Sequence, residues 1–150
     1  MNRIELSKNL YLDEYIPEEV YNLKLKTWGK AWINVLRRKI NPLLISSDQF
    51  LRDQFGPVSI NTWWNGGTHN LSGLRFTGYK PRGSSDWSDH FQGNASDKSF
   101  KNASAQEVRD WLKKSQNWKR AGVTIIEENV SWVHTSVSWT DLNTLKIVKP

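Results

Sequence analysis

The sequence predicts an α+β fold in which N-terminal helices pack on a small, mainly antiparallel sheet. Apolar residues with helical spacing dominate between residues 18 and 55, whereas alternating or β-branched segments occupy 58–64 and 123–137. The 150 residues suffice for one domain, and neither a repeat nor a long linker divides them. We therefore expect a single domain over residues 1–150.

The first third of the chain is expected to be an arm followed by two helices. Residues 1–17 are interpreted as an ordered N-terminal arm that carries a short turn. In residues 18–40 the apolar side chains recur at spacings of three to five, which predicts one helix ending at Asn41-Pro42. Ser46-Ser47-Asp48 predicts the N-cap of a second helix, which Gly56-Pro57 closes.

The middle of the chain predicts a strand, a long loop and a second strand. Residues 58–64 alternate between apolar and polar side chains before two tryptophans. Residues 68–89 are rich in glycine and serine, and a loop of this length in a compact domain is where a functional site is expected. A short strand is expected within residues 91–100.

The last third predicts a helix and a β-hairpin. Ser104 and Glu107 form the sequence pattern of a capping box. Residues 123–127 and 131–137 predict two strands close enough to pair as an antiparallel hairpin. A connection symmetric about residues 129 and 130 would place Glu127 opposite Trp132.

Composition excludes several classes of protein. The absence of cysteine excludes a disulfide scaffold, a thiolate zinc site and a cysteine nucleophile. The chain has no apolar run of about 18 residues and a polar start, so we expect no membrane insertion, no signal peptide and synthesis in a cytoplasm. Tryptophan is unusually frequent, with nine copies, and each could belong to the core or to the wall of a cleft.

The charge balance favours an anionic partner. The chain has 21 lysines and arginines against 15 aspartates and glutamates, a net charge of +6. Nucleic acid, a polyanionic cell wall or an acidic protein would each suit this charge, and a merely solvated surface is the alternative. Apart from Arg37-Arg38-Lys39 and Lys119-Arg120, the positive charge is spread along the sequence.

Two of the three histidines have neighbours that indicate metal chemistry, whereas His69 is taken as an ordinary polar residue. His90 precedes Asp97, with small residues between them. On a strand, His134 faces the same side as Trp132, and in the expected hairpin so does Glu127. Two imidazoles and one carboxylate suit a catalytic zinc, and a second carboxylate can then take a proton from the attacking water. Hydrogen-bonded histidines without a metal are the simpler alternative.

At this point the motifs resemble a known family. Residues 88–97 read Ser-x-His-x-x-Gly-x-Ala-x-Asp. This pattern is similar to the first ligand motif of the zinc D-alanyl-D-alanine carboxypeptidase and L-alanyl-D-glutamate endopeptidase family (LAS-type peptidases), which includes phage endolysins. Trp132-Val133-His134 resembles the second ligand motif, and Ser72-Gly73-Leu74-Arg75 resembles the family's Ser-Gly-Tyr-Arg segment. The likeness follows the family's motif order along nearly the whole chain and points to small phage-encoded members.

The resemblance implies a LAS-type fold with His90, Asp97 and His134 as zinc ligands. It further implies that Arg75 stabilises charge on the substrate or in the transition state. Glu127 is the candidate general base; in many members the glutamate stands three residues before the last histidine, where this chain has Ser131. The candidate substrate-binding residues are Ser88, Tyr79 and Trp132. Position 98, usually apolar in the family, is Lys98, which is expected to disturb burial of the strand.

The implied function is that of a phage-type zinc metallopeptidase that cleaves peptidoglycan stem peptides, either as an endolysin or carried in the virion. The protein would be made in the host cytoplasm and act at the bacterial cell wall. The alternative is a catalytically degenerate structural or assembly protein that keeps the peptidase fold and contacts other virion proteins. A nucleic-acid-binding module is the least favoured interpretation.

Overall fold

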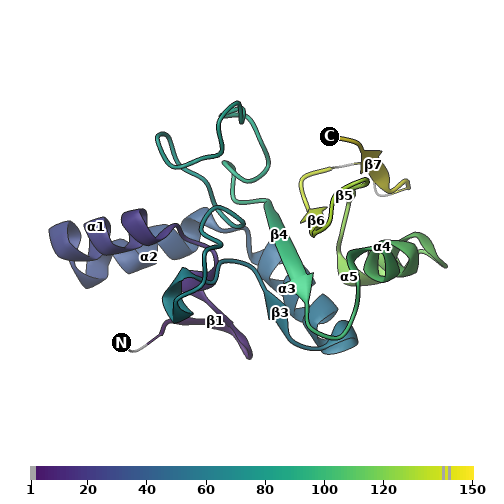
Figure 1. Cartoon of the computed structure of the whole chain (residues 1–150), viewed down its shortest axis with the longest axis horizontal. Coiled ribbons are helices and arrows are strands. Elements are labelled where there is room, and N and C mark those ends of the chain that lie inside the picture. The colour runs from purple at the N-terminus through teal and green to yellow at the C-terminus, as the bar shows by residue number, and fades with distance from the viewer. Residues whose placement is uncertain (1–2, 140, 142) are drawn as a thin grey trace.

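Five short strands form the main sheet of the protein. A computed structural model describes residues 3–139, 141 and 143–150 (Figure 1). The sheet order is β3-β4-β6-β5-β7. All neighbouring strands are antiparallel except β5 and β7, so the expected mainly antiparallel sheet with helices packed on it is confirmed. The strands are β3 (Val58–Ser59), β4 (Ala95–Phe100), β5 (Ile125–Glu127), β6 (Val133–Ser136) and β7 (Lys146–Val148).

The N-terminal segment belongs to the core. Strands β1 (Glu5–Ser7) and β2 (Leu10–Tyr11) form a separate two-stranded antiparallel sheet, and Leu12–Glu14 follow as a 3₁₀ turn. Residues 12–17 are all buried. Leu74 donates its backbone N–H to the carbonyl of Tyr15 at 2.7 Å, so this segment supports the loop that precedes the candidate site.

The helix predicted over residues 18–40 is in fact two helices, α1 (Glu18–Trp28) and α2 (Lys30–Lys39). They are separated by Gly29, whose φ of +59° suits glycine and interrupts the helical backbone. Because the apolar spacing continues across Gly29, periodicity alone did not indicate the break. The two helices contact one another, and the first part of α1 and the last part of α2 are buried in the core.

Helix α3 (Pro42–Phe55) has its N-cap at Asn41, at least five residues before the predicted N-cap at Ser46-Ser47-Asp48. Asn41 and Pro42 start this helix rather than only ending the previous one: the Asn41 side chain accepts from the Leu43 N–H at 2.9 Å, and proline suits the first helical position. The helix ends before Gly56, as predicted. It then spans both parts of the core, with Leu44 in one hydrophobic cluster and Leu51 in the other.

The strand predicted over residues 58–64 is confirmed only for its first two residues, because the paired tryptophans lie in a 3₁₀ turn (Trp63–Asn65). The indole of Trp63 donates to the Ile16 carbonyl at 2.8 Å, and that of Trp64 to the Asn61 carbonyl at 2.9 Å. These bonds satisfy the polar atom of each half-buried ring. The Trp63 bond also ties the 3₁₀ turn to the N-terminal segment.

The C-terminal half contains two elements that the sequence did not predict. Helix α4 (Ala105–Lys113) begins at the predicted capping box, in which Ser104 and Glu107 exchange hydrogen bonds. Helix α5 (Asn117–Ala121) and strand β7 were not predicted, since elements of three to five residues are too short to show a clear periodicity.

The pairing of β5 with β6 differs from the predicted register by two residues. Ile125 pairs with Ser136 and Ile126 with Thr135, so the continued ladder aligns Glu127 with His134 rather than with Trp132. A shift of two residues keeps every side chain on its predicted face. Glu127 and His134 therefore share one face of the sheet, as expected, and lie directly across from one another.

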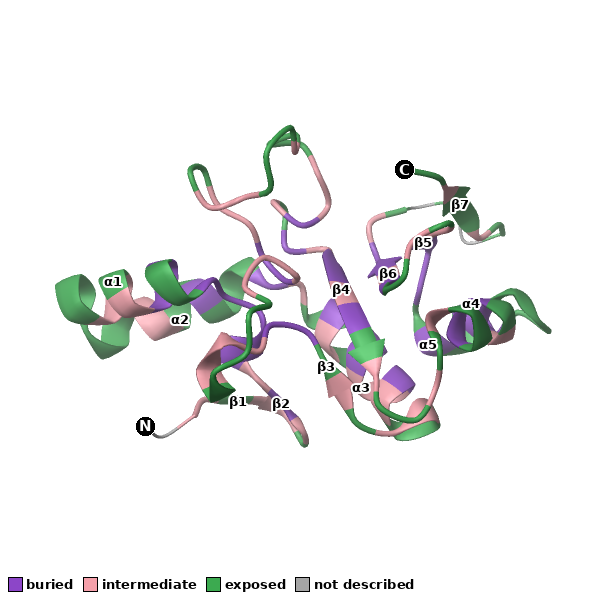
Figure 2. Cartoon of the chain, viewed as in Figure 1, coloured by how far each residue is buried: buried purple, intermediate pink, exposed green. Residues whose placement is uncertain are grey.

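Figure 2 shows buried residues along much of β4 and on part of α3. Just before β4, Gly93 has a φ of +74°, and a Cβ at this position would come within 1.9 Å of the Lys39 carbonyl oxygen. The Gly93 carbonyl in turn accepts from the Asn41 N–H at 3.0 Å. Glycine is thus required where the chain passes the end of α2 on its way to the candidate site.

Gly93→Ala is expected to destabilise the protein by at least about 2 kcal/mol, because it adds a backbone clash to an unfavourable φ. Gly83→Ala is the control: its φ is +82°, but a Cβ there meets no atom within 4 Å. The control should cost only about 1 kcal/mol. Denaturant unfolding measures both, and equal losses would show that the close approach at Gly93 is not a constraint.

Candidate metal centre

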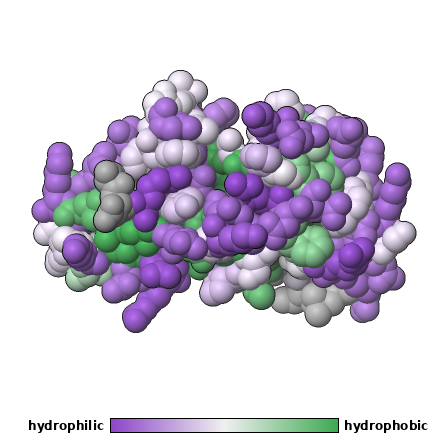
Figure 3. Space-filling view, turned by 90° about the horizontal axis from the view of Figure 1, so that it is seen from below, coloured by the Kyte–Doolittle hydropathy of each residue, from purple (hydrophilic) through white to green (hydrophobic). Residues whose placement is uncertain are grey.

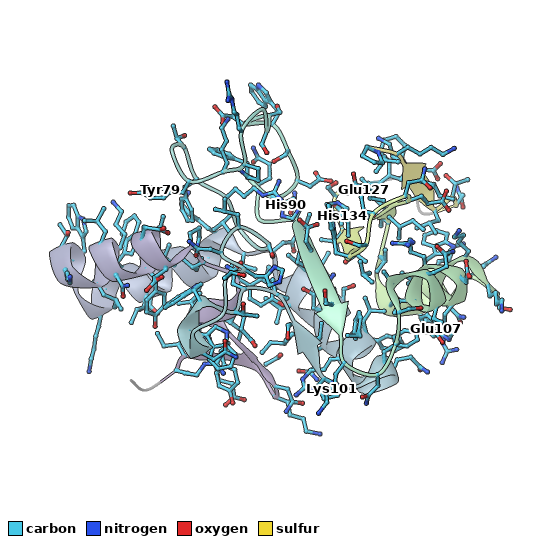
Figure 4. All side chains as sticks on the ribbon, viewed as in Figure 1. Tyr79, His90, Lys101, Glu107, Glu127 and His134 are labelled. Atoms are coloured by element: carbon cyan, nitrogen blue, oxygen red, sulfur yellow. The ribbon has the colours of Figure 1, made fainter. Side chains whose placement is uncertain are left out.

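Three side chains converge at one face of the β4–β6 pair. Asp97 lies in the middle of β4 and is paired in the ladder with His134 of β6, while His90 comes from the loop that leads into β4. Each of the three offers a ligand atom within 4.8 Å of the other two. Figure 4 shows His90 and His134 together at the end of β4, with Glu127 beside them. The cluster could hold a metal ion.

The orientation of His90 is fixed by its backbone contact. The side chain is 3% exposed, and its Nδ1 lies 2.9 Å from the Gly73 carbonyl oxygen. Because a carbonyl only accepts, Nδ1 carries the proton and Nε2 keeps its lone pair for the cluster. A Cβ on Gly73 would lie 2.4 Å from the Tyr15 carbonyl oxygen, so glycine allows the acceptor to reach this place.

The three ligand atoms have nearly the separations that a tetrahedral ion requires. His90 Nε2 lies 3.2 Å from His134 Nδ1 and 3.3 Å from Asp97 Oδ1. Ligand atoms at about 2.0–2.1 Å from a tetrahedral zinc lie about 3.3 Å apart. The third separation, 2.7 Å between His134 Nδ1 and Asp97 Oδ1, is that of a hydrogen bond and would lengthen slightly around an ion.

Burial and the contacts within the cluster favour the protonation states in which these side chains can bind a metal ion. Burial acts to raise the pKa of Asp97, but the contacts with the His134 and His90 imidazoles outweigh it and hold that pKa well below the usual range. Burial also lowers the pKa of His90, an effect that the Asp97 carboxylate opposes. Asp97 is thus a carboxylate, and His90 favours the neutral form that a metal binds.

Arg75 closes one side of the cluster. Its Nε donates to the Leu71 carbonyl at 2.9 Å, and one terminal nitrogen donates to Asp97 Oδ2 at 3.0 Å. This leaves Oδ1 of Asp97 for the histidines. Burial lowers the pKa of Arg75, while the negative charges of Asp97 and Glu127 oppose that shift.

The two adjacent glutamates have different surroundings. Glu127 is half-buried and, among the residues that the structure describes, forms no hydrogen bond or ion pair. Glu128 pairs with Lys113 of α4 at 2.5 Å, on the other side of the strand. Ser131 is exposed and borders a separate small hollow with Ser104. Of these two glutamates, Glu127 is therefore the one without a described partner, and the continued β5–β6 register aligns it with His134.

A groove of about 450 Å³ adjoins the cluster. Asp97, Arg75 and the half-exposed ring of Trp132 are among the residues that line it. His69, which the sequence analysis set aside, lines the same groove. Its place in the glycine-rich loop 68–89 was the only sequence signal for this, because an isolated histidine has no motif.

The remaining candidate residues lie elsewhere or have structural contacts. Tyr79 borders a different groove, against α1, and Figure 4 shows it apart from the histidines. The Ser88 carbonyl accepts from the backbone of Phe91 and Gln92, which forms the turn that carries His90. The role of Ser88, Tyr79 and Trp132 in substrate binding stays a prediction, and only Trp132 borders the groove beside Asp97.

Lys98 does not disturb the strand, contrary to expectation. Its side chain is fully buried and reaches Asp48 of α3 at 2.8 Å, while its ammonium also donates to the Thr135 hydroxyl. Asp48 accepts further hydrogen bonds from Tyr15 and Ser96. The residues on both sides of Asp97 are thus tied to α3 through one buried carboxylate.

In comparisons with known proteins, no family profile, curated protein or solved structure matches this chain. Within the described residues, no helix is both long enough and apolar enough to cross a membrane.

Proposed function

We propose that the protein is a zinc-dependent peptidase that cleaves the stem peptides of peptidoglycan. The observation that carries the proposal is the convergence of two imidazole nitrogens and one carboxylate oxygen at near-tetrahedral spacing beside a groove. The motif likeness to LAS-type peptidases supports the same substrate class and suggests that the α+β arrangement belongs to that fold.

The donor set suits zinc. His90, Asp97 and His134 supply two nitrogens and one oxygen, and catalytic zinc sites commonly have three such protein ligands with one position left open. When bound, zinc supplies a Lewis acid for the scissile carbonyl and lowers the pKa of water at the site to about 7.

The other residues of the site supply proton transfer and charge stabilisation. The continued β5–β6 register aligns Glu127 with His134, and Glu127 has no partner among the described residues. We assign it the role of accepting a proton from water and returning it to the leaving amine. Arg75 uses only part of its guanidinium on Leu71 and Asp97. Its remaining N–H groups can bind a substrate carboxylate or the developing oxyanion.

The surroundings of the site are compatible with a wall peptide. The groove offers a tryptophan wall, a cation and several hydroxyl groups, which suits an extended, acidic peptide. The net charge of +6 favours approach to an anionic wall. We place the protein, made in a host cytoplasm, at the bacterial wall as a phage endolysin or virion-associated enzyme.

Incubation of the zinc-loaded protein with purified peptidoglycan should release new amino groups from the stem peptides. A chelator should stop this release, and added zinc should restore it. Intact peptidoglycan in the presence of bound zinc, alongside an active control hydrolase, would contradict the proposed activity.

Bound zinc without cleavage would instead support a catalytically degenerate virion structural or assembly protein. Such a protein has the site but does not turn over substrate. Ser131 is the observation that favours this second candidate, because the position three residues before His134 carries no carboxylate. Association with other virion proteins would then be the activity to measure.

A further inference from the structure

Positive charge is concentrated in residues 23–40 of one helical hairpin. Residues 23–40 contain six lysines and arginines and no acidic residue, so the other 15 basic residues balance the 15 acidic ones. The positive charge that seemed spread along the sequence is therefore concentrated on α1 and α2. We call the segment of residues 18–40 the α1–α2 arm; because Glu18 and Glu19 lie at its start, the net charge of the whole arm is +4.

One end of the arm packs in the core, and the other end is exposed. At its base, Val20 and Tyr21 of α1 and Leu36 of α2 are buried in the N-terminal core. At its tip, residues 26–31 are all exposed. Figure 1 shows the arm extending from one end of the molecule, and Figure 2 shows the green, exposed tip. The exposed tip of the arm is therefore available to contact a partner.

The arm also exposes apolar side chains among its lysines. Trp28 is 61% exposed, Leu23 50% and Val35 38%. Figure 3 shows hydrophobic surface at this end of the molecule, bordered by hydrophilic residues. Lys24 lies over the ring of Trp32 at 4.7 Å, so aromatic and cationic groups are directly associated. Exposed apolar surface of this kind indicates an interaction site.

We propose that the α1–α2 arm docks onto the surface of an anionic lipid bilayer. A soluble polyanion would be attracted by the lysines and arginines alone and would gain nothing from exposed Leu23 and Val35. A bilayer uses both features, because anionic headgroups attract the cations while the boundary below them accepts tryptophan and aliphatic side chains. The arm would lie in the headgroup layer without crossing it. This binding is independent of the proposed peptidase activity.

Vesicle co-sedimentation tests the proposal. The full-length protein should sediment with vesicles of equal parts phosphatidylglycerol and phosphatidylcholine and not with pure phosphatidylcholine. The double variant Lys26→Glu/Lys30→Glu should weaken binding about tenfold or more. The matched control Lys101→Glu/Lys114→Glu changes the same charge at exposed sites outside the arm and should stay within about twofold. Trp28→Ser, which leaves the charge unchanged, should also weaken binding several-fold.

Circular dichroism of each variant excludes unfolding as the cause of a loss. Equal losses in the two double variants would overturn the proposal, since diffuse net charge would then explain the binding. Binding unaffected by Trp28→Ser would overturn it as well, because the apolar contribution would be missing. Arm-dependent binding to duplex DNA or to poly(glycerol phosphate), without vesicle binding, would identify a different partner and contradict a bilayer.

Discussion

Lys98→Met is expected to destabilise the protein by about 3–5 kcal/mol. The substitution keeps most of the volume of the side chain but leaves the carboxylate of Asp48, which is fully buried, without its cation. A buried charge that loses its partner carries the whole cost of desolvation. Because Ser96 and Lys98 flank Asp97 and both contact Asp48, we also expect zinc affinity to fall in this variant.

Asp48→Asn added to Lys98→Met separates charge from packing. Asparagine keeps an acceptor for Tyr15 and Ser96 but removes the buried charge, so the double variant should recover about 2 kcal/mol relative to Lys98→Met. Lys101→Met is the control at an exposed site of the same type and should stay within about 0.5 kcal/mol of the wild type. Urea unfolding measures all three, and a Lys98→Met variant as stable as the control would show that the ion pair does not support the strand.

Glu127→Gln should lower the rate of peptidoglycan cleavage by about 10²–10⁴-fold while zinc still binds. Glutamine occupies the same space and can still accept a hydrogen bond, but it does not take a proton from water. Since Glu127 is not one of the three clustered ligands, the metal content should be unchanged.

Glu128→Gln is the matched control for this experiment. Glu128 is the neighbouring residue, but it contacts Lys113 on the other side of the strand. Its replacement should leave the rate within about twofold of the wild type, because an exposed ion pair contributes little. If Glu128→Gln removed activity and Glu127→Gln did not, the assignment of the base would be reversed.

Much of the candidate site could be predicted because its residues are local in sequence or follow the alternation of a strand. The motif resemblance grouped His90 and Asp97 as ligands, and strand alternation predicted that His134 and Glu127 share a face. The exact register could not be predicted, since it depends on a connection in which Asn129 adopts a φ of +62°. Because the register error was two residues, both side chains remained on the predicted face of the sheet.

The errors arose where distant contacts decide the outcome. Lys98 looked unsuitable for a buried strand because its partner Asp48 lies 50 residues earlier and was assigned only as a helix cap. The positive charge seemed dispersed because folding of α1 and α2 into one arm, through Gly29, is not visible in the periodicity. His69 gave no sequence signal, since only the folded loop brings it to the groove beside Asp97.

Equilibrium titration of zinc into the metal-free protein tests the central claim most directly. We predict one zinc per chain for the wild type and loss of that binding in His90→Ala, His134→Ala and Asp97→Ala, each of which removes one of the clustered ligands. His69→Ala, the same change at the remaining histidine, should bind zinc as the wild type does. A wild type that binds no zinc, or binding that survives all three ligand substitutions, would contradict the metal centre.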